Sequence, residues 1–142
     1  MDELRATHRE RPLVLIVEDQ PELRQLYAQE LTMSGFEVIE AGNGADAISH
    51  ASSHVPDVVV MDLSLPVVDG WEATRRIKDD RRTTHIPVVA LTAHDGSGEL
   101  QRATRAGCDW FVPKPCQPHD LIEEVRRILG ARDAAASRVT QI

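Results

Sequence analysis

The sequence predicts a doubly wound α/β fold, in which helices cover both faces of a five-stranded parallel sheet. Five short apolar segments alternate with amphipathic segments along the chain, an order typical of βα repeats joined by right-handed crossovers. Three of the apolar segments are continuous, rich in β-branched residues and free of polar alternation. That pattern is typical of parallel strands buried on both faces.

The five predicted strands are short and evenly distributed, at residues 13–17, 36–39, 58–61, 88–91 and 110–112. The first helix follows the first strand, and its opening turn contains Pro21, a residue suited to that position. Its predicted core-facing stripe consists of Leu23, Leu26, Tyr27 and Leu31.

The next three helices carry weaker apolar stripes, formed by Ala47, Ile48 and Ala51, then by Trp71, Thr74 and Ile77, and then by Leu100, Ala103 and Ala106. The last helix has the clearest stripe, formed by Leu121, Ile122, Val125, Ile128 and Leu129. We expect Gly130 to end this helix. The predicted organisation is an N-terminal extension at 1–11, one domain at 12–130 and a frayed, flexible tail at 131–142.

Bulk properties narrow the possible functions. A chain of 142 residues has the size of one ordinary domain, and its net charge of −7 argues against a nucleic-acid surface. No apolar run approaches the roughly 20 residues that span a bilayer, and residues 1–11 lack the apolar core of a secretory signal. We therefore expect a cytoplasmic protein that does not bind membranes. Cys108 and Cys116 have no metal-ligand spacing and are expected to be free thiols.

Chemically useful side chains follow four of the predicted strands. Glu18 and Asp19 follow the first strand, Asp62 the third, Thr92 the fourth and Lys114 the fifth. In an open α/β sheet the carboxyl ends of the strands form one rim, where ligands bind. We therefore expect three carboxylates, one hydroxyl and one ammonium group to converge there.

This combination predicts a phosphoryl-transfer site. Crowded carboxylates repel one another, and Mg²⁺ is the natural counter-ion because it takes one or two carboxylates and phosphate oxygens. A carboxylate can attack phosphorus, and cations and donors then stabilise the charge that develops on the phosphoryl oxygens, here Mg²⁺, Lys114 and Thr92. Taken singly, each residue has a plainer explanation as a turn, cap or surface residue. Their joint occurrence at the strand ends favours the functional interpretation.

Over Pro12–Gly130 the sequence resembles the receiver domains of two-component signalling. The resemblance rests on these motifs: Val17-Glu18-Asp19, Asp62-Leu63-Ser64-Leu65-Pro66, Asp69-Gly70, Leu91-Thr92-Ala93 and Lys114-Pro115. It implies the flavodoxin-like strand order 2-1-3-4-5. It also implies that Asp62 is the phosphoacceptor and that Mg²⁺ is held by Glu18, Asp19, Asp62 and the backbone carbonyl of Ser64.

The resemblance further implies a switch. Thr92 would be the switch hydroxyl and Lys114 the phosphate-binding ammonium, followed by a cis Pro115. Phe111 stands where the switch aromatic is often tyrosine, so no ring hydroxyl is available there. Cys116 occupies a position that is usually apolar or aromatic.

The partners implied are a sensor histidine kinase or phosphotransfer protein as phosphoryl donor, and a downstream protein bound by the face of helix 4, strand 5 and helix 5. The domain would assist its own phosphorylation and dephosphorylation without being an enzyme in the ordinary sense, and would not bind DNA directly. We also expect the path of the hydrolytic water to pass Ser64 and His94. Two alternatives stay open for His94: it gates that water, or it is an exposed loop histidine with no kinetic role.

Two alternatives come from other classes. Gly42-Asn43-Gly44-Ala45-Asp46-Ala47 fits a dinucleotide-binding pattern, but Glu40 would lie near the pyrophosphate, and Thr92 and Lys114 would have no role. A helix-entry turn that uses glycine is the better explanation. The second alternative is an interaction module of the same fold that is not phosphorylated. The complete set of site residues argues against it.

Overall fold

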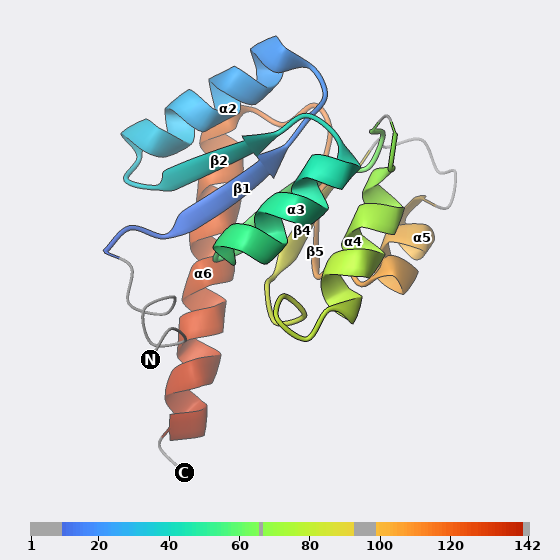
Figure 1. Cartoon of the computed structure of the whole chain (residues 1–142). Coiled ribbons are helices and arrows are strands. Elements are labelled where there is room, and N and C mark those ends of the chain that lie inside the picture. The colour runs from blue at the N-terminus through green and yellow to red at the C-terminus, as the bar shows by residue number, and fades with distance from the viewer. Residues whose placement is uncertain (1–9, 66, 93–98, 141–142) are drawn as a thin grey trace.

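The computed structural model of the chain describes residues 10–65, 67–92 and 99–140, and it contains a five-stranded parallel sheet (Figure 1). The strand order is β2-β1-β3-β4-β5, which confirms the predicted topology. The strands are β1 (Leu13–Val17), β2 (Glu37–Ala41), β3 (Val58–Asp62), β4 (Val88–Thr92) and β5 (Trp110–Pro113). The helices are α2 (Pro21–Met33), α3 (Gly44–His54), α4 (Gly70–Asp79), α5 (Glu99–Ala106) and α6 (Pro118–Thr140).

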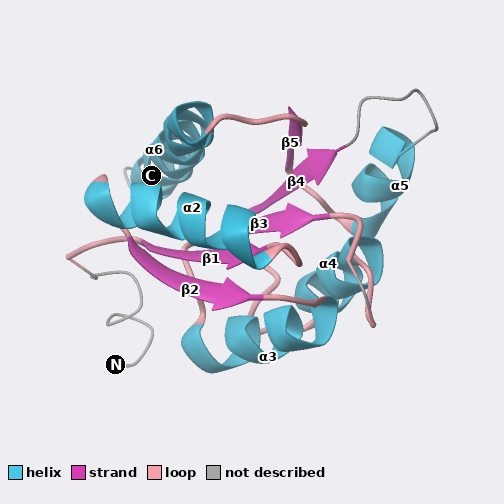
Figure 2. Cartoon of the chain, turned by 90° about the horizontal axis from the view of Figure 1, so that it is seen from above, coloured by secondary structure: helices cyan, strands magenta, loops and turns pink. Residues whose placement is uncertain are grey.

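Helices cover both faces of the sheet, as Figure 2 shows: α2 and α6 lie on one face and α3, α4 and α5 on the other. Each layer encloses its own apolar core. Val14, Ile16 and Val60 point toward α2 and α6, whereas Leu15 and Val59 point toward the opposite layer. Because every residue of β1, β3 and β4 is buried, these strands have no polar alternation, which explains their continuous apolar sequences.

The first helix departs from its predicted stripe at one residue. Tyr27 and Leu31 are buried and Leu23 is half-buried, but Leu26 is 44% exposed. A helix has about 3.6 residues per turn, so residues four positions apart lie on nearly the same face. That face carries Leu23, Tyr27 and Leu31. Leu26 lies to one side of it. The expectation that Leu26 faces the core is therefore wrong.

The last helix does not end at Gly130. Helix α6 continues to Thr140, so the predicted helix end is wrong for 131–140. A glycine inside a helix costs about 1 kcal/mol, and here strong helix formers follow it, with alanine at 131, 134, 135 and 136 and no proline. The guanidinium of Arg132 also donates to the Asp57 carboxylate at 2.9 Å, which fixes the helix beyond Gly130. The domain boundaries of 12–130 stay a prediction.

Three smaller expectations can be compared with the structure. Cys108 and Cys116 are free thiols, as predicted. Trp71 is half-buried against the core under α3, α4 and α5, and the guanidinium of Arg102 stacks 3.8 Å from its ring centroid. Among the described residues, no helix is both long and apolar enough to cross a bilayer.

Candidate functional site

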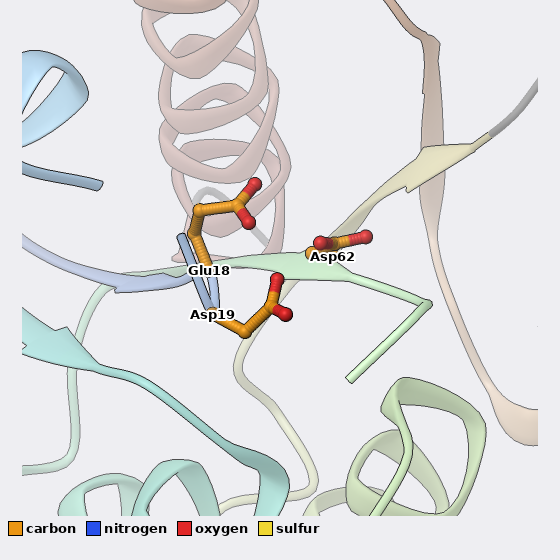
Figure 3. A group of neighbouring side chains, drawn as sticks. All are labelled: Glu18, Asp19 and Asp62. Atoms are coloured by element: carbon orange, nitrogen blue, oxygen red, sulfur yellow. The ribbon is translucent and has the colours of Figure 1, made fainter. Parts of the chain in front are cut away.

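The acidic residues of the site leave neighbouring strands at the same edge of the sheet. Strands β1 and β3 pair in parallel with Val17 opposite Met61, so Glu18 and Asp62, each one residue further on, come next to each other. Carboxylate oxygens of Glu18, Asp19 and Asp62 all lie within 4.8 Å of one another. Figure 3 shows Glu18 and Asp19 at the end of β1 with their carboxyl groups on the side of Asp62. The predicted convergence of the three carboxylates is present.

Two of these carboxylates are buried. Glu18 is 1% and Asp62 2% exposed, whereas Asp19 is exposed. One oxygen of Glu18 accepts a hydrogen bond from the Gln20 backbone amide at 3.1 Å, and the other is buried and has no partner among the described residues. Burial, partly offset by this hydrogen bond and reinforced by the neighbouring Asp62 carboxylate, raises the pKa of Glu18 to about 7. The site therefore contains more negative charge than its own donors can balance.

Lys114 supplies the site's ammonium group. Its Nζ lies 2.7 Å from Oδ1 of Asp62, and its backbone amide donates to the carbonyl of Thr92 at 2.8 Å. The same Asp62 oxygen accepts from the backbone amide of Ser64 at 3.1 Å. The Lys114–Pro115 peptide bond is cis, as the resemblance implied. One oxygen of Asp62 is thus held by two donors, which orients the carboxylate.

The remaining predicted residues occupy the expected elements. Thr92 is the last residue of β4 and is 3% exposed, and it directly follows Leu91, the partner of Asp62 in the sheet. Phe111 lies on β5 and is 36% exposed. Ser64 is exposed, and its role as a carbonyl ligand stays a prediction. His94 lies outside the described residues.

The loop after Asp62 explains why glycine follows Asp69. A Cβ atom at Gly70 would lie 2.5 Å from the backbone oxygen of Asp62 and 2.6 Å from Cα of Leu63. The Gly70 amide donates to the Leu63 carbonyl at 3.1 Å, and the Asp69 carboxylate caps α4 by accepting from the Glu72 amide at 2.9 Å. Any side chain at Gly70 would push against the end of β3, so this residue shapes the acceptor site.

Helix α2 contributes two residues that the sequence did not identify as part of the site. Arg24 donates to the backbone carbonyl of Glu18 at 2.9 Å and pairs with Glu40 at 3.1 Å. The hydroxyl of Tyr27 donates to the backbone carbonyl of Cys116 at 2.7 Å. In the sequence, Tyr27 is simply a member of an apolar stripe, and no local pattern reveals its distant partner.

The glycine-rich segment after β2 is a helix-entry turn. The Asn43 side chain caps α3 by accepting from the Asp46 amide at 2.8 Å, and β2 is an edge strand, as expected. Gly44 is required for space, since a Cβ there would lie 2.0 Å from the carbonyl oxygen of Val68. These contacts account for the segment without a dinucleotide.

The residues present fit a magnesium ion. Mg²⁺ is bound by oxygen ligands, commonly one or two carboxylates with several waters, and three carboxylates meet here. The buried Glu18 oxygen without a hydrogen-bond donor is the kind of group that a cation satisfies.

The comparisons with known proteins agree with this geometry. Residues 14–126 match the family described as the response regulator receiver domain. The chain is 38% identical over 117 residues to the polar-differentiation response regulator DivK of Brucella anthropi, covering 82% of this chain and 95% of that protein.

Solved structures show the same fold. The receiver domain of the sensor histidine kinase PA1611 of Pseudomonas aeruginosa PAO1, which has a magnesium ion coordinated in its active-site cleft, is 30% identical with a TM-score of 0.78, over 84% of this chain and 98% of that one. The chemotaxis response regulator CheY4 of Vibrio cholerae is 27% identical with a TM-score of 0.76, over 83% and 98%. The chain belongs to the response regulator receiver domain family of two-component signalling.

Proposed function

We propose that this receiver domain is switched by transfer of a phosphoryl group to Asp62 from a histidine kinase or phosphotransfer protein, in a reaction that requires Mg²⁺. One observation carries the proposal. The buried Asp62 carboxylate lies 2.7 Å from the Lys114 ammonium and within 4.8 Å of two further carboxylates. Asp62 therefore has an ammonium group on one side and the carboxylates of Glu18 and Asp19 on the other.

The transfer forms a bond between an Asp62 oxygen and phosphorus, and breaks the bond between phosphorus and an imidazole nitrogen of the donor. The electron pair of the broken bond stays on that imidazole. Lys114 and the Ser64 amide both contact Oδ1 of Asp62, so they orient the carboxylate and leave Oδ2 as the attacking oxygen.

Glu18, Asp19, Asp62 and the carbonyl of Ser64 would hold Mg²⁺, and the magnesium ion of the Pseudomonas receiver domain supports this assignment. When bound, the ion neutralises charge on the phosphoryl oxygens during transfer. Lys114 then provides a point charge to one of these oxygens, and the Thr92 hydroxyl donates to another. The domain in this way assists its own phosphorylation and dephosphorylation.

The proposed output is a change of the face formed by α5, β5 and α6. Phosphorylation adds a charge of about −1.5 to −2 and three acceptor oxygens. Thr92 is bonded to Lys114 through its backbone carbonyl, so a movement toward the phosphoryl group at the end of β4 reaches β5, where Phe111 lies. A downstream protein in the cytoplasm would bind this face, and the net charge of −7 disfavours DNA as the direct partner.

Intact-mass measurement after incubation with acetyl phosphate and Mg²⁺ tests the proposal. Wild-type protein should gain one base-labile phosphoryl group, and Asp62→Asn should gain none. Asp57→Asn is the matched control, because Asp57 lies at the other end of β3 and should leave labelling unchanged. If wild-type protein takes up no phosphoryl group from acetyl phosphate or from phosphorylated kinase, the alternative of an interaction module without phosphorylation is correct.

A further inference from the structure

Tyr27 is a buried residue of α2 with a polar group directed at a distant loop. The residue is 3% exposed, and its hydroxyl donates to the carbonyl of Cys116 at 2.7 Å across 89 residues of sequence. Burial, with the nearby Cys116, Glu18 and Asp62, raises the pKa of Tyr27 to about 12. The phenol therefore stays protonated and donates throughout the physiological pH range.

The loop that receives this hydrogen bond carries the site's ammonium group. Lys114 and Cys116 are separated by Pro115 alone, and prolines at 113, 115 and 118 cannot donate backbone hydrogen bonds. At one end of the loop the Lys114 amide is bonded to Thr92, and at the other the Gln117 carbonyl accepts from Leu121 in α6. Between these two points, the hydrogen bond that Tyr27 donates to Cys116 joins the loop to another element.

Helix α2 is itself joined to the opposite side of the site. Arg24, one turn before Tyr27, donates to the backbone carbonyl of Glu18 at 2.9 Å. The two side chains thus link the acidic loop after β1 and the lysine loop after β5 through a single rigid helix.

We propose that Tyr27 is a positioning residue: its hydroxyl fixes the Lys114–Cys116 loop and so sets the position of the Lys114 ammonium beside Asp62. The inference rests on the proposed function, because Lys114 is there the residue that contacts the phosphoryl group. The hydroxyl of Tyr27 donates to the Cys116 carbonyl and not to a carboxylate of the site among the described residues. Its effect reaches the site through Lys114.

Tyr27→Phe removes one hydroxyl and retains the ring, and two affinities measured on the whole chain distinguish positioning from general weakening. Mg²⁺ alone should bind Tyr27→Phe as tightly as wild type, because the carboxylates are untouched. Beryllofluoride, a phosphoryl mimic, should bind with Mg²⁺ about three- to tenfold more weakly, the range expected for one lost hydrogen bond. Thr83→Val is the matched control, since the buried Thr83 hydroxyl donates to the Ile77 carbonyl at 2.6 Å, outside the acidic site, and its loss should change neither affinity.

A double-mutant cycle tests whether the effect passes through Lys114. In a Lys114→Ala background, Tyr27→Phe should weaken beryllofluoride binding no further. Equal beryllofluoride affinity in Tyr27→Phe and wild type, or the same loss with and without Lys114, would overturn the inference.

A second measurement keeps Tyr27 in place, so it does not depend on the folding of Tyr27→Phe. Tyr27 is the single tyrosine of the chain, and its 3-fluorotyrosine ¹⁹F resonance should shift when beryllofluoride and Mg²⁺ bind, and should not shift in Lys114→Ala. An unmoved resonance in the protein with intact Lys114 contradicts the inference. A wild-type protein that binds no beryllofluoride at all would instead refute the proposed function.

Discussion

Strand β3 has an aspartate at each end, and the two are used differently. Asp57, directly before the strand, accepts from the Leu13 amide at 2.7 Å and from Arg132 at 2.9 Å, so both of its carboxylate oxygens have donors. Asp62, the last residue of the strand, has two donors on Oδ1 and lies in a cluster of carboxylates. The Asp57 carboxylate is thus fully hydrogen-bonded within the protein, whereas the carboxylate cluster at Asp62 can still bind a ligand.

The same contrast extends to other strands of the sheet. Asp109, directly before β5, accepts from the Val88 amide and from Lys78 Nζ, both at 2.8 Å. At the other edge, a buried oxygen of Glu18 has no hydrogen-bond partner among the residues described. An acidic residue at the end of a strand therefore does not by itself mark a functional site. Unfilled acceptors together with unbalanced charge are the better indicator.

The largest expected effect comes from Asp62→Asn, which removes the nucleophile while keeping the shape of the side chain. We expect complete loss of phosphoryl uptake and a melting temperature close to that of wild type. Intact mass and circular dichroism measure both. Stoichiometric labelling of the variant would show that another residue is the acceptor.

The next effect concerns the metal. Asp19→Ala should weaken Mg²⁺ binding by about 10- to 100-fold, because it removes one of three clustered carboxylates. Gln20→Ala is the adjacent control and should bind normally. Titration calorimetry gives both dissociation constants, and equal affinity in wild type and Asp19→Ala would contradict the assignment of the metal site.

Lys114→Arg should separate chemistry from switching. The planar guanidinium cannot replace a compact ammonium that contacts a single phosphoryl oxygen, so we expect uptake from acetyl phosphate within about threefold of wild type. The amide resonances of β5 and α6, however, should no longer shift when beryllofluoride binds. Full wild-type shifts in the variant would refute the predicted role of Lys114.

The raised pKa of Glu18, about 7 against 4.5 for an ordinary glutamate, predicts how stability varies with pH. Between these values the folded state holds a proton that the unfolded chain has lost. Without metal, the free energy of unfolding should therefore fall as pH rises from about 5 to 7, by at most ~3 kcal/mol. Urea unfolding in EDTA measures this slope. Glu18→Gln should flatten it, and an unchanged slope would place the titration on another group.

The smallest effect on function is expected from a change at Asp57, at the amino-terminal end of β3. Asp57→Ala leaves the Leu13 amide without its acceptor and should lower the free energy of unfolding by about 1–3 kcal/mol. Phosphoryl uptake and Mg²⁺ affinity should stay at wild-type values. A loss of either would mean that the two ends of β3 are functionally coupled, and the contrast drawn above would fail.

The sequence predicted most of the fold and the meeting of Glu18, Asp19 and Asp62 at one rim, because both follow from short-range patterns. Continuous apolar runs identify buried parallel strands, and the position of Asp62 directly after such a run predicts where its side chain lies. Contacts between elements were not predictable in this way. The Tyr27 hydroxyl reaches a carbonyl 89 residues away, and the reason for glycine at position 70 is a backbone contact across a turn. The end of α6 was missed because one glycine was given more weight than the alanines after it.

Because α6 continues through Gly130, a small rotation of the helix would move its far end by a larger distance. Among the residues of α6 up to 135, whose burial is described, Leu129 is the last buried one. The helical backbone continues to Thr140, which is about 16 Å further at 1.5 Å per residue. A tilt of about 10° at the body of the domain would displace the far end of such a rod by about 3 Å. The Arg132–Asp57 ion pair holds α6 to the domain close to Leu129. A change of that pair would alter the displacement of Thr140 that a given rotation of α6 produces.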